Sequence, residues 1–397
     1  MTETSRPTPW MDEGPAEPKA RVVAFYLPQF HPIPENDAWW GPGFTEWTNV
    51  ARARPLYRGH VQPHLPADLG FYDLRLPDVR EAQAALAQCH GIEGFCYWHY
   101  WFGGRRVLER PFEEVLSSGS PKFPFMLGWA NQTWSGIWHG DPERILIEQT
   151  YPGLADHERH FQYLLTAFVD PRYIRVNGRP AFYVYRPREV PGVLEMTGLW
   201  RRMARQAGLP GLYLIAQDTF VDRNRGPVEG FDATAQVNLP RIRPCNRVQR
   251  IRRRLRRGVV VHDYECWLPR FVTEDVCRPD VHPCVIPNWD NTPRSGYGGM
   301  VLSGSTPESF RVQVRRALEL IQEKPMEHRL LFVKSWNEWA EGNYLEPDRE
   351  HGKAYLEALA AETLQGSRPE GDRMGEGSIP IPPSGSGFAQ MQVRRLG

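Results

Sequence analysis

The residues best suited to do chemistry are two glutamates near the end of the chain, Glu338 and Glu341. They follow the apolar run 330–333 and lie next to Trp336 and Trp339. Side chains three residues apart share a face in a helical turn but not on a strand, where the period is two. Two carboxylates aimed at one point can cleave a glycosidic bond, one as acid and one as an ionised group. The indoles would stack on sugars and raise the pKa of a nearby carboxyl.

Two other interpretations of this Glu-x-x-Glu pattern stay open. Such a pair is usually a solvated helix face, although the preceding strand and the flanking tryptophans weigh against that here. A di-metal carboxylate site would need Glu-x-x-His pairs on other helices, and the sequence has none. We therefore expect no metal and no organic cofactor.

Further candidate substrate-binding residues follow other predicted strands. An aromatic-rich loop, 35–69, is long enough to be functional. His99 follows the second strand among aromatic residues, where a sugar-binding histidine and a satisfied core histidine are both plausible. The complete set of predicted sugar contacts is Trp40, Glu46, Trp47, Tyr97, His99, Trp129, Asn131, Trp134, Asp290, Asn291, Trp336 and Asn337.

A basic segment from Arg241 to Gly258 contains nine arginines. Its densest part predicts an anion site at Arg252, Arg253 and Arg254, for the phosphates of an activated or lipid-linked sugar or for anionic lipid headgroups. The segment would then be a peripheral membrane contact. The alternative is a solvated basic loop. Nucleic acid is not expected, because the basic run is confined to one segment of a protein with a net charge of +1.

Composition predicts a globular protein rather than a membrane-spanning one. The 397 residues are 41% hydrophobic, which is ample for a core. There is no stretch of 18 apolar residues, and the first 20 residues lack the apolar run of a signal peptide. The six cysteines lack Cys-x-x-Cys spacing, which is typical of reduced thiols. We expect a cytoplasmic protein, at the membrane surface if the basic segment binds lipid.

Eight apolar runs alternate with helical segments, which predicts a (β/α)8 TIM barrel of the α/β class with long aromatic-rich βα loops. The strands are expected at residues 21–27, 94–102, 123–129, 180–185, 212–216, 231–237, 284–291 and 330–333, and the helices at 77–90, 110–116, 156–168, 193–207, 306–323 and 351–364. A doubly wound sheet would want a glycine-rich turn after the first strand, and Leu27-Pro28-Gln29 is not one. We expect a disordered arm at 1–20, one barrel domain at 21–365 and a disordered tail at 366–397.

The chain resembles the WbsX-type family of polysaccharide-biosynthesis proteins, whose barrel is similar to glycoside hydrolase family 99, the endo-acting α-mannosidases. The resemblance covers about residues 21–362. The matching segments are Phe25–His31, Glu35–Gly41, Gly43–Trp47, Asp68–Tyr72, Trp129–Asn131, Pro287–Asn291, Trp336–Gly342 and Leu345–Pro347.

The resemblance implies roles for the two glutamates. Glu341 matches the general acid/base, and Glu338 matches the residue that assists the substrate 2-hydroxyl in forming a 1,2-anhydro sugar with net retention. The chain departs from the WbsX pattern at Gln132, where a glutamate usually follows Trp-Ala-Asn. Any role for charge at that position is therefore in doubt.

Three functions remain in view, all with a glycan as partner. The first is a hydrolase or transglycosylase of a surface polysaccharide such as lipopolysaccharide O-antigen. The second is a glycosyltransferase that uses a phosphate-bearing donor. The basic segment favours it, whereas the lack of an Asp-x-Asp motif and of a nucleotide-binding turn weighs against it. The third is a glycan-binding protein without turnover, in which the paired glutamates would have no purpose.

Overall fold

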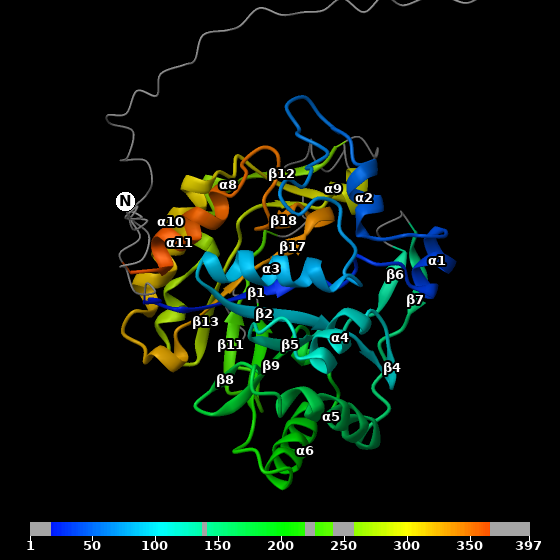
Figure 1. Ribbon diagram of the computed structural model, residues 1–397, viewed down its shortest axis with the longest axis vertical. Coiled ribbons are helices and arrows are strands. Elements are labelled where there is room, and N and C mark those ends of the chain that lie inside the picture. The colour runs from blue at the N-terminus through cyan, green and yellow to red at the C-terminus, as the bar shows by residue number, and fades with distance from the viewer. Residues whose placement is uncertain (1–16, 137–140, 219–226, 241–257, 366–397) are drawn as a thin grey trace, which may run out of the picture. The chain divides into compact units, whose positions relative to one another are not determined.

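The computed structural model describes residues 17–136, 141–218, 227–240 and 258–365 (Figure 1). The predicted anion site, Arg252 to Arg254, and the tail 366–397 lie outside the described residues. So does the predicted arm up to residue 16. The last residues of that arm are described: the Lys19 backbone N–H donates to the Thr363 carbonyl at 2.7 Å.

Eight parallel strands close into a barrel, which confirms the predicted fold. In order around the barrel they are β1 (Arg21–Tyr26), β2 (Ile92–His99), β5 (Phe125–Trp129), β9 (Arg179–Val184), β10 (Tyr213–Asp218), β11 (Ala233–Gln236), β13 (Val281–Val285) and β16 (Leu330–Val333). The pairing of β9 with β10 closes the ring. These strands are almost wholly buried, as expected where helices cover a parallel sheet.

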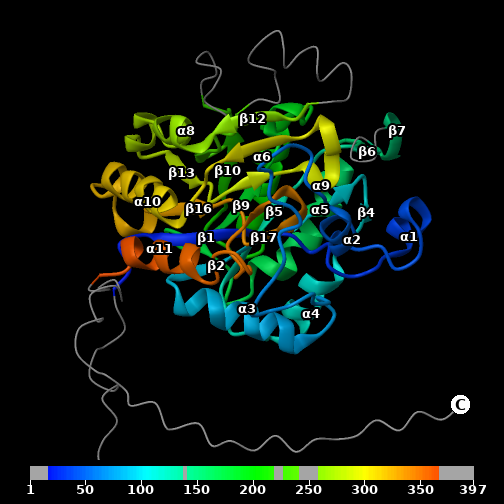
Figure 2. The ribbon, with the colours of Figure 1, turned by 90° about the horizontal axis from the view of Figure 1, so that it is seen from above.

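The predicted helices are present, with small differences at their ends. They are α3 (Pro77–Cys89), α4 (Arg110–Ser118), α5 (Leu154–Phe168), α6 (Val193–Gln206), α10 (Pro307–Ile321) and α11 (Ala354–Thr363). The Thr306 hydroxyl caps α10, whose first residue is Pro307. Figures 1 and 2 both show α10 and α11 next to each other.

The long region after β1 contains two short helices that the sequence did not predict, α1 (Pro34–Trp40) and α2 (Glu46–Arg52). Other additions are α8 (Tyr264–Phe271), α9 (Thr292–Ser295) and a small sheet of β12 (Val260–Asp263), β14 (Trp289–Asp290) and β15 (Met300–Ser303). The remaining short strands are β3 (Trp101–Phe102), β4 (Arg105–Arg106), β6 (Trp134–Gly136), β7 (Asp141–Ile147), β8 (Arg175–Val176), β17 (Asn337–Glu338) and β18 (Asn343–Tyr344).

The seventh predicted strand was placed too late in the chain. The barrel strand is β13, whereas Asp290 belongs to β14 and pairs with β15 outside the barrel. His282 and Pro283 interrupt the apolar pattern of β13, so the sequence pattern predicts a strand only in the apolar residues that follow them.

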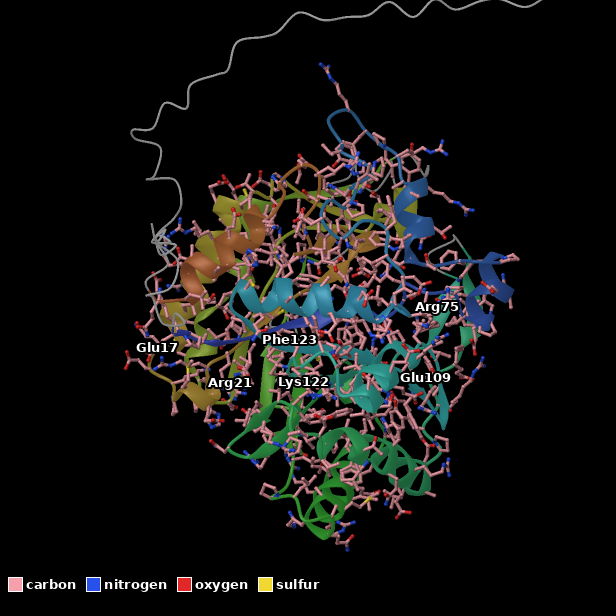
Figure 3. All side chains as sticks on the ribbon, viewed as in Figure 1. Glu17, Arg21, Arg75, Glu109, Lys122 and Phe123 are labelled. Atoms are coloured by element: carbon pink, nitrogen blue, oxygen red, sulfur yellow. The ribbon has the colours of Figure 1, made fainter. Side chains whose placement is uncertain are left out.

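Aromatic rings fill the barrel interior. Phe25 stacks on Trp98 with ring centroids 4.8 Å apart and also contacts Tyr183 and Phe332. Arg21, which is labelled in Figure 3, begins β1 at its opposite end. It pairs with Glu93 at 2.6 Å and donates to the Arg175 carbonyl. Side chains near both ends of β1 thus contact other strands of the barrel.

No helix within the described ranges is long and apolar enough to cross a membrane. The described cysteines, Cys89, Cys96, Cys266, Cys277 and Cys284, are free thiols.

Candidate active site

The segment after β16 is attached to the end of β1 by hydrogen bonds. The Trp336 backbone N–H and the Ser335 hydroxyl both donate to the Phe25 carbonyl, at 2.7 Å each. The Asn337 side chain accepts from the Leu27 N–H and donates to the Leu27 carbonyl. These bonds place Glu338, which directly follows Asn337, at the carboxyl end of the barrel strands. Active sites of such barrels lie at this end.

The buried carboxylate of Glu346 connects the same segment to other parts of the barrel by hydrogen bonds. Glu346 accepts hydrogen bonds from the Trp339 indole at 2.6 Å, the Gln83 amide at 2.7 Å and the Tyr72 hydroxyl at 2.8 Å. Burial raises the pKa of Glu346 to about 7, although these donors lower it. The segment is therefore connected both to β1 and to α3.

Glu338 and Glu341 meet at one guanidinium, that of Arg294. The Nη2 atom of Arg294 lies 2.9 Å from Glu338 Oε2, and its Nη1 atom lies 2.7 Å from Glu341 Oε1. A third carboxylate, Glu46, contacts Arg294 at 2.6 Å and is fully buried. The turn that carries the two acids is a 3-10 helix, Trp339–Glu341, with Glu338 just before it. The predicted turn thus exists, in a tighter form.

Burial and mutual repulsion alter the protonation of this cluster. Burial and the neighbouring Glu341 raise the pKa of Glu338 to about 7, against the lowering effects of Arg294 and Lys334. Burial also raises the pKa of Glu46, an effect that Arg294 opposes. Burial disfavours the charge of Arg294, but the three glutamates raise its pKa above the ordinary value. One carboxyl of the pair can therefore exchange a proton near neutral pH.

A cavity opens over the two acids, and we call it the catalytic cavity. Its walls come from the ends of several strands and combine aromatic, amide and charged groups. The lining residues are Leu27, Gln29, Trp98, Tyr100, Ala130, Gln132, Trp134, Tyr185, Arg294, Lys334, Glu338 and Glu341. Gln132 and Trp134 also line an adjoining pocket with Trp39 and Trp40. The amide of Gln132 thus stands between two cavities.

The structure brings part of the predicted set to these cavities. Glu338, Glu341 and Trp134 line the catalytic cavity, and Trp40 lines the adjoining pocket. Glu46 lies behind the acids, bound to Arg294. Asp290 lines a third pocket, described below.

The other residues predicted to contact sugar either pack in the core or form hydrogen bonds to the backbone. In the structure their role is to support the fold. Trp47, Tyr97, Trp129 and Trp336 are buried among other rings. Asn131 bridges to Arg186, and Asn291 accepts from the Met300 N–H. Asn337 holds Leu27 as described. None of these residues lines the three cavities described here.

His99 is the satisfied core histidine that was one of the two alternatives. Its Nε2 lies 2.9 Å from His160 Nε2, and its ring stacks on Tyr163. Burial lowers the pKa of His99 to about 3, so the ring is neutral at physiological pH.

Several lining residues were missed from the sequence. Arg294 follows Thr292-Pro293 in a short helix and lies 44 residues before Glu338, so no local spacing connects them. Lys334 ends the apolar run 330–333, and its ammonium lies 5.5 Å from the Trp289 ring centroid. Trp98 and Tyr100 alternate with the predicted Tyr97 and His99. A signal existed here, because alternate strand residues face opposite sides, and the other pair faces the cavity.

Comparison with known proteins identifies the family to which the chain belongs. The family model Glycosyltransferase WbsX matches residues 22–359. The uncharacterised protein WxcX of Xanthomonas campestris pv. campestris is 41% identical over 344 residues, which are 85% of this chain and 49% of that protein. The chain thus spans about half the length of the curated relatives it matches.

Solved structures support the fold. A glycoside hydrolase-like protein has a TM-score of 0.56 at 15% identity and covers 91% of this chain and 98% of its own. The GH99 endo-α-mannosidase of Bacteroides thetaiotaomicron has a TM-score of 0.50 at 12% identity and covers 86% of this chain and 95% of its own. At these identities the likeness concerns the barrel alone. By its sequence, the chain belongs to the WbsX glycosyltransferase family.

Proposed function

We propose that the chain is a carbohydrate-active enzyme that cleaves or transfers glycosidic bonds of a surface polysaccharide with net retention. The observation that carries this proposal is the meeting of Glu338 and Glu341 at Arg294, inside a cavity lined by aromatic rings. Two carboxylates on one guanidinium favour the short separation of retaining enzymes, about 5–5.5 Å, over the about 6.5–9.5 Å of inverting ones. The names of the family and of the barrel neighbours point to the same class of substrate.

Each acid has a role that follows from its surroundings and from the resemblance. Ionised Glu338 takes the proton of the sugar 2-hydroxyl as that oxygen bonds to C1. The bond from C1 to the leaving oxygen breaks, and Glu341 gives that oxygen its proton. Water then attacks C1 and the bond from C1 to the 2-oxygen breaks. Glu341 takes a proton from the water, and Glu338 returns its proton to the 2-oxygen. An acceptor hydroxyl in place of water gives transfer.

A pKa near 7 suits Glu338 for this exchange, because a general base works best when its pKa lies near the operating pH. Arg294 and Lys334 stabilise the ionised acids in a buried site. Glu46 balances the charge of Arg294 on the side away from the cavity and keeps its guanidinium in place. We infer that Glu46 positions Arg294 rather than binding sugar.

The test is product analysis by mass spectrometry. Wild type, Glu338→Gln, Glu341→Gln and the surface control Glu357→Gln are incubated with bacterial surface polysaccharides, beginning with that of Xanthomonas campestris. We expect fragments from wild type and control only, with turnover at least 10³-fold lower in both active-site variants, on the order seen when a catalytic group is removed. NMR of the first product should show the anomeric configuration of the substrate.

A glycosyltransferase is the second candidate, favoured by the name of the family. If wild type gives no fragments, but extends an acceptor when a phosphate-bearing sugar donor is added, the cleavage proposal is wrong. The basic segment, Arg241 to Gly258, would then be the first place to look for the donor phosphate. Its anion site and its membrane contact stay predictions.

A further inference from the structure

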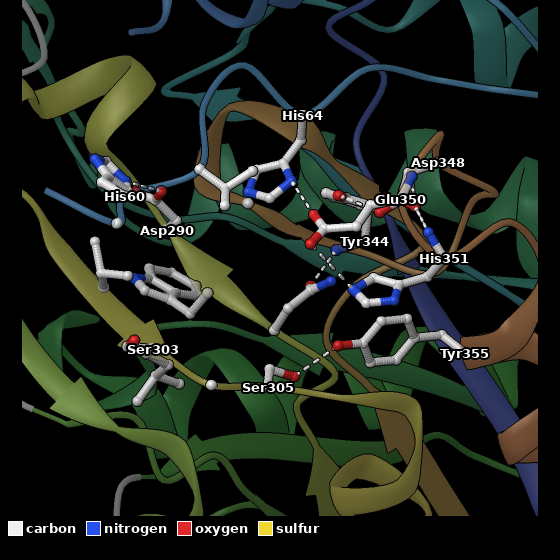
Figure 4. A pocket seen from close by; sticks show the side chains of 18 of the residues that line it. His60, His64, Asp290, Ser303, Ser305, Tyr344, Asp348, Glu350, His351 and Tyr355 are labelled. Atoms are coloured by element: carbon white, nitrogen blue, oxygen red, sulfur yellow. Dashed lines mark hydrogen bonds and ion pairs between the residues drawn. The ribbon is translucent and has the colours of Figure 1, made fainter. Parts of the chain in front are cut away.

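The third pocket lies on the other side of the segment that carries the acids: Glu341 lines the catalytic cavity, and Gly342, the next residue, lines this pocket. It is formed by the loop 57–64, by β14 and β15, and by residues 342–355. Its volume is about 170 Å³, against about 70 Å³ for the catalytic cavity. We call it the histidine pocket, after His60, His64 and His351, which line it (Figure 4).

Two of its three acids are fully engaged within the protein. Asp290 accepts from His60 at 2.7 Å, from Gln62 at 2.6 Å and from Thr292. Asp348 accepts from the Tyr344 hydroxyl at 2.7 Å and from two backbone N–H groups. These carboxylates shape the pocket and leave little capacity for a ligand.

The third acid is different. Glu350 lies between His64 and His351, at 3.9 Å and 4.0 Å, which is beyond hydrogen-bonding distance, and its side chain is 48% exposed (Figure 4). It can therefore accept hydrogen bonds from a bound hydroxyl pair, with the histidine rings able to donate or accept beside it. Ser303 and the Tyr355 hydroxyl, which is paired with Ser305, add further polar groups to the wall.

The remaining wall is aromatic. Tyr57, Trp289, Tyr344 and Tyr355 all line the pocket. The indole N–H of Trp289 is buried and has no hydrogen-bond partner among the described residues. Apolar rings next to a few polar groups are typical of small-molecule sites.

The charge of the pocket selects against anions. Its described lining contains three carboxylates and no lysine or arginine. A phosphate or a uronic acid would meet net negative charge, whereas a neutral or amino-bearing sugar would not.

The histidine pocket is structurally continuous with the catalytic segment. Gly342 lines it and directly follows Glu341. A Cβ at Gly342 would lie 2.7 Å from the Asp290 backbone nitrogen, so the two walls are in close contact there. Trp289 lines the pocket, while Lys334, whose ammonium faces that ring, lines the catalytic cavity.

We propose that the histidine pocket binds a second, neutral or amino-bearing sugar unit of the same glycan whose bond is broken at Glu338 and Glu341. This inference rests on the proposed function for the identity of the glycan. Binding in the pocket requires no turnover, so it is tested separately.

The experiment is saturation-transfer NMR with methyl glycosides of glucose, mannose, galactose, rhamnose, glucosamine and N-acetylglucosamine, and with methyl glucuronide. The proteins are wild type, Glu341→Gln, Glu350→Ala and Ser303→Trp, with Glu357→Ala as a matched control. Ser303 is exposed, so a tryptophan there fills the pocket without disturbing the core.

We expect at least one neutral or amino glycoside to bind wild type, Glu341→Gln and the control. Its Kd should rise at least tenfold in Glu350→Ala and in Ser303→Trp, and the glucuronide should not bind. Binding that survives both pocket variants, that requires Glu341, or that favours the glucuronide would overturn the proposal, as would no binding by any glycoside. Because Glu341→Gln lacks the catalytic acid, a positive result stands even if the cleavage proposal fails.

Discussion

The guanidinium of Arg294 neutralises the buried carboxylates of the site. It contacts three carboxylates, and its side chain is only 4% exposed. Removing a partner from a buried ion pair leaves an uncompensated charge, which costs about 3–5 kcal/mol. The acids therefore depend on Arg294 for their ionised forms as well as for their geometry.

The pKa of Glu338 leads to a prediction about pH. If ionised Glu338 is the base, kcat/KM should rise through about pH 7. The folded pKa exceeds the ordinary value of 4.5, so the folded state holds more protons between about pH 4.5 and 7, and stability falls as pH rises through that window. Initial rates from pH 5 to 9, and urea unfolding at pH 5 and 8, check both statements.

The matched comparison is Glu338→Gln. Its unfolding free energy should depend less on pH than that of wild type, but some dependence should remain, because the pKa of Glu346 is raised to about 7 as well. An unchanged pH dependence of stability in this variant would contradict the assignment of the raised pKa to Glu338.

At the scale of residues, the sequence predicts what is local. Glu338 and Glu341 are recognisable because they are three positions apart in the sequence. Their counter-ion is not, because Arg294 reaches them through folding alone. Trp336 and Trp339 were expected to stack on sugars, yet both are buried. An indole packs equally well in a core, and local sequence does not tell the two environments apart.

Among the elements, the segment from Lys334 to Glu346 matters most, since it carries both acids. Glu346 joins it to Gln83 on α3 and to Tyr72. The acids are thus held from two sides, by β1 through Asn337 and by α3 through Glu346.

We predict that Glu346→Ala lowers the unfolding free energy by about 3 kcal/mol or more, because it leaves three buried donors unpaired at about 1–3 kcal/mol each. Glu357→Ala, on the exposed face of α11, should change it by less than about 0.5 kcal/mol. Urea denaturation measures both. Equal midpoints for the two variants would mean that this network does not support the segment.

Elements were predictable where the apolar pattern was continuous. The run Leu330–Val333 became β16 without change. The pattern failed where tertiary contacts decide the structure. In the region after β1, the backbone of Glu46 donates to the Gln29 carbonyl, and its carboxylate meets Arg294 248 residues away. These contacts stabilise α2, which the sequence alone suggested only as a loop.

At the scale of the whole molecule, the aromatic rings inside the barrel pack directly against a wall of the catalytic cavity. Phe332 contacts Phe25 and Tyr183, and Phe25 stacks on Trp98, which lines the cavity. The rings inside the barrel therefore pack directly against the wall of the catalytic cavity. The alternation of strands and helices was enough to predict this architecture, since a parallel sheet with crossover helices has few closed arrangements.

Phe332→Ala should cost about 3–5 kcal/mol, because it leaves a cavity between the rings of the barrel interior. Phe71→Ala is the control, since that side chain is 56% exposed, and its cost should be clearly smaller. Both are measured by urea unfolding at one pH. Similar costs would mean that these interior rings do not stabilise the barrel.

The way the acids are held together has a consequence for synthesis on the ribosome. Glu46 is made early, Arg294 much later, and Glu338 and Glu341 follow only after β16, the strand that completes the barrel between β13 and β1. A nascent chain that ends before Arg294 lacks the cation that neutralises Glu46 in the folded protein. Assembly of this cluster therefore coincides with closure of the ring, and a nascent chain that ends before β16 contains neither Glu338 nor Glu341.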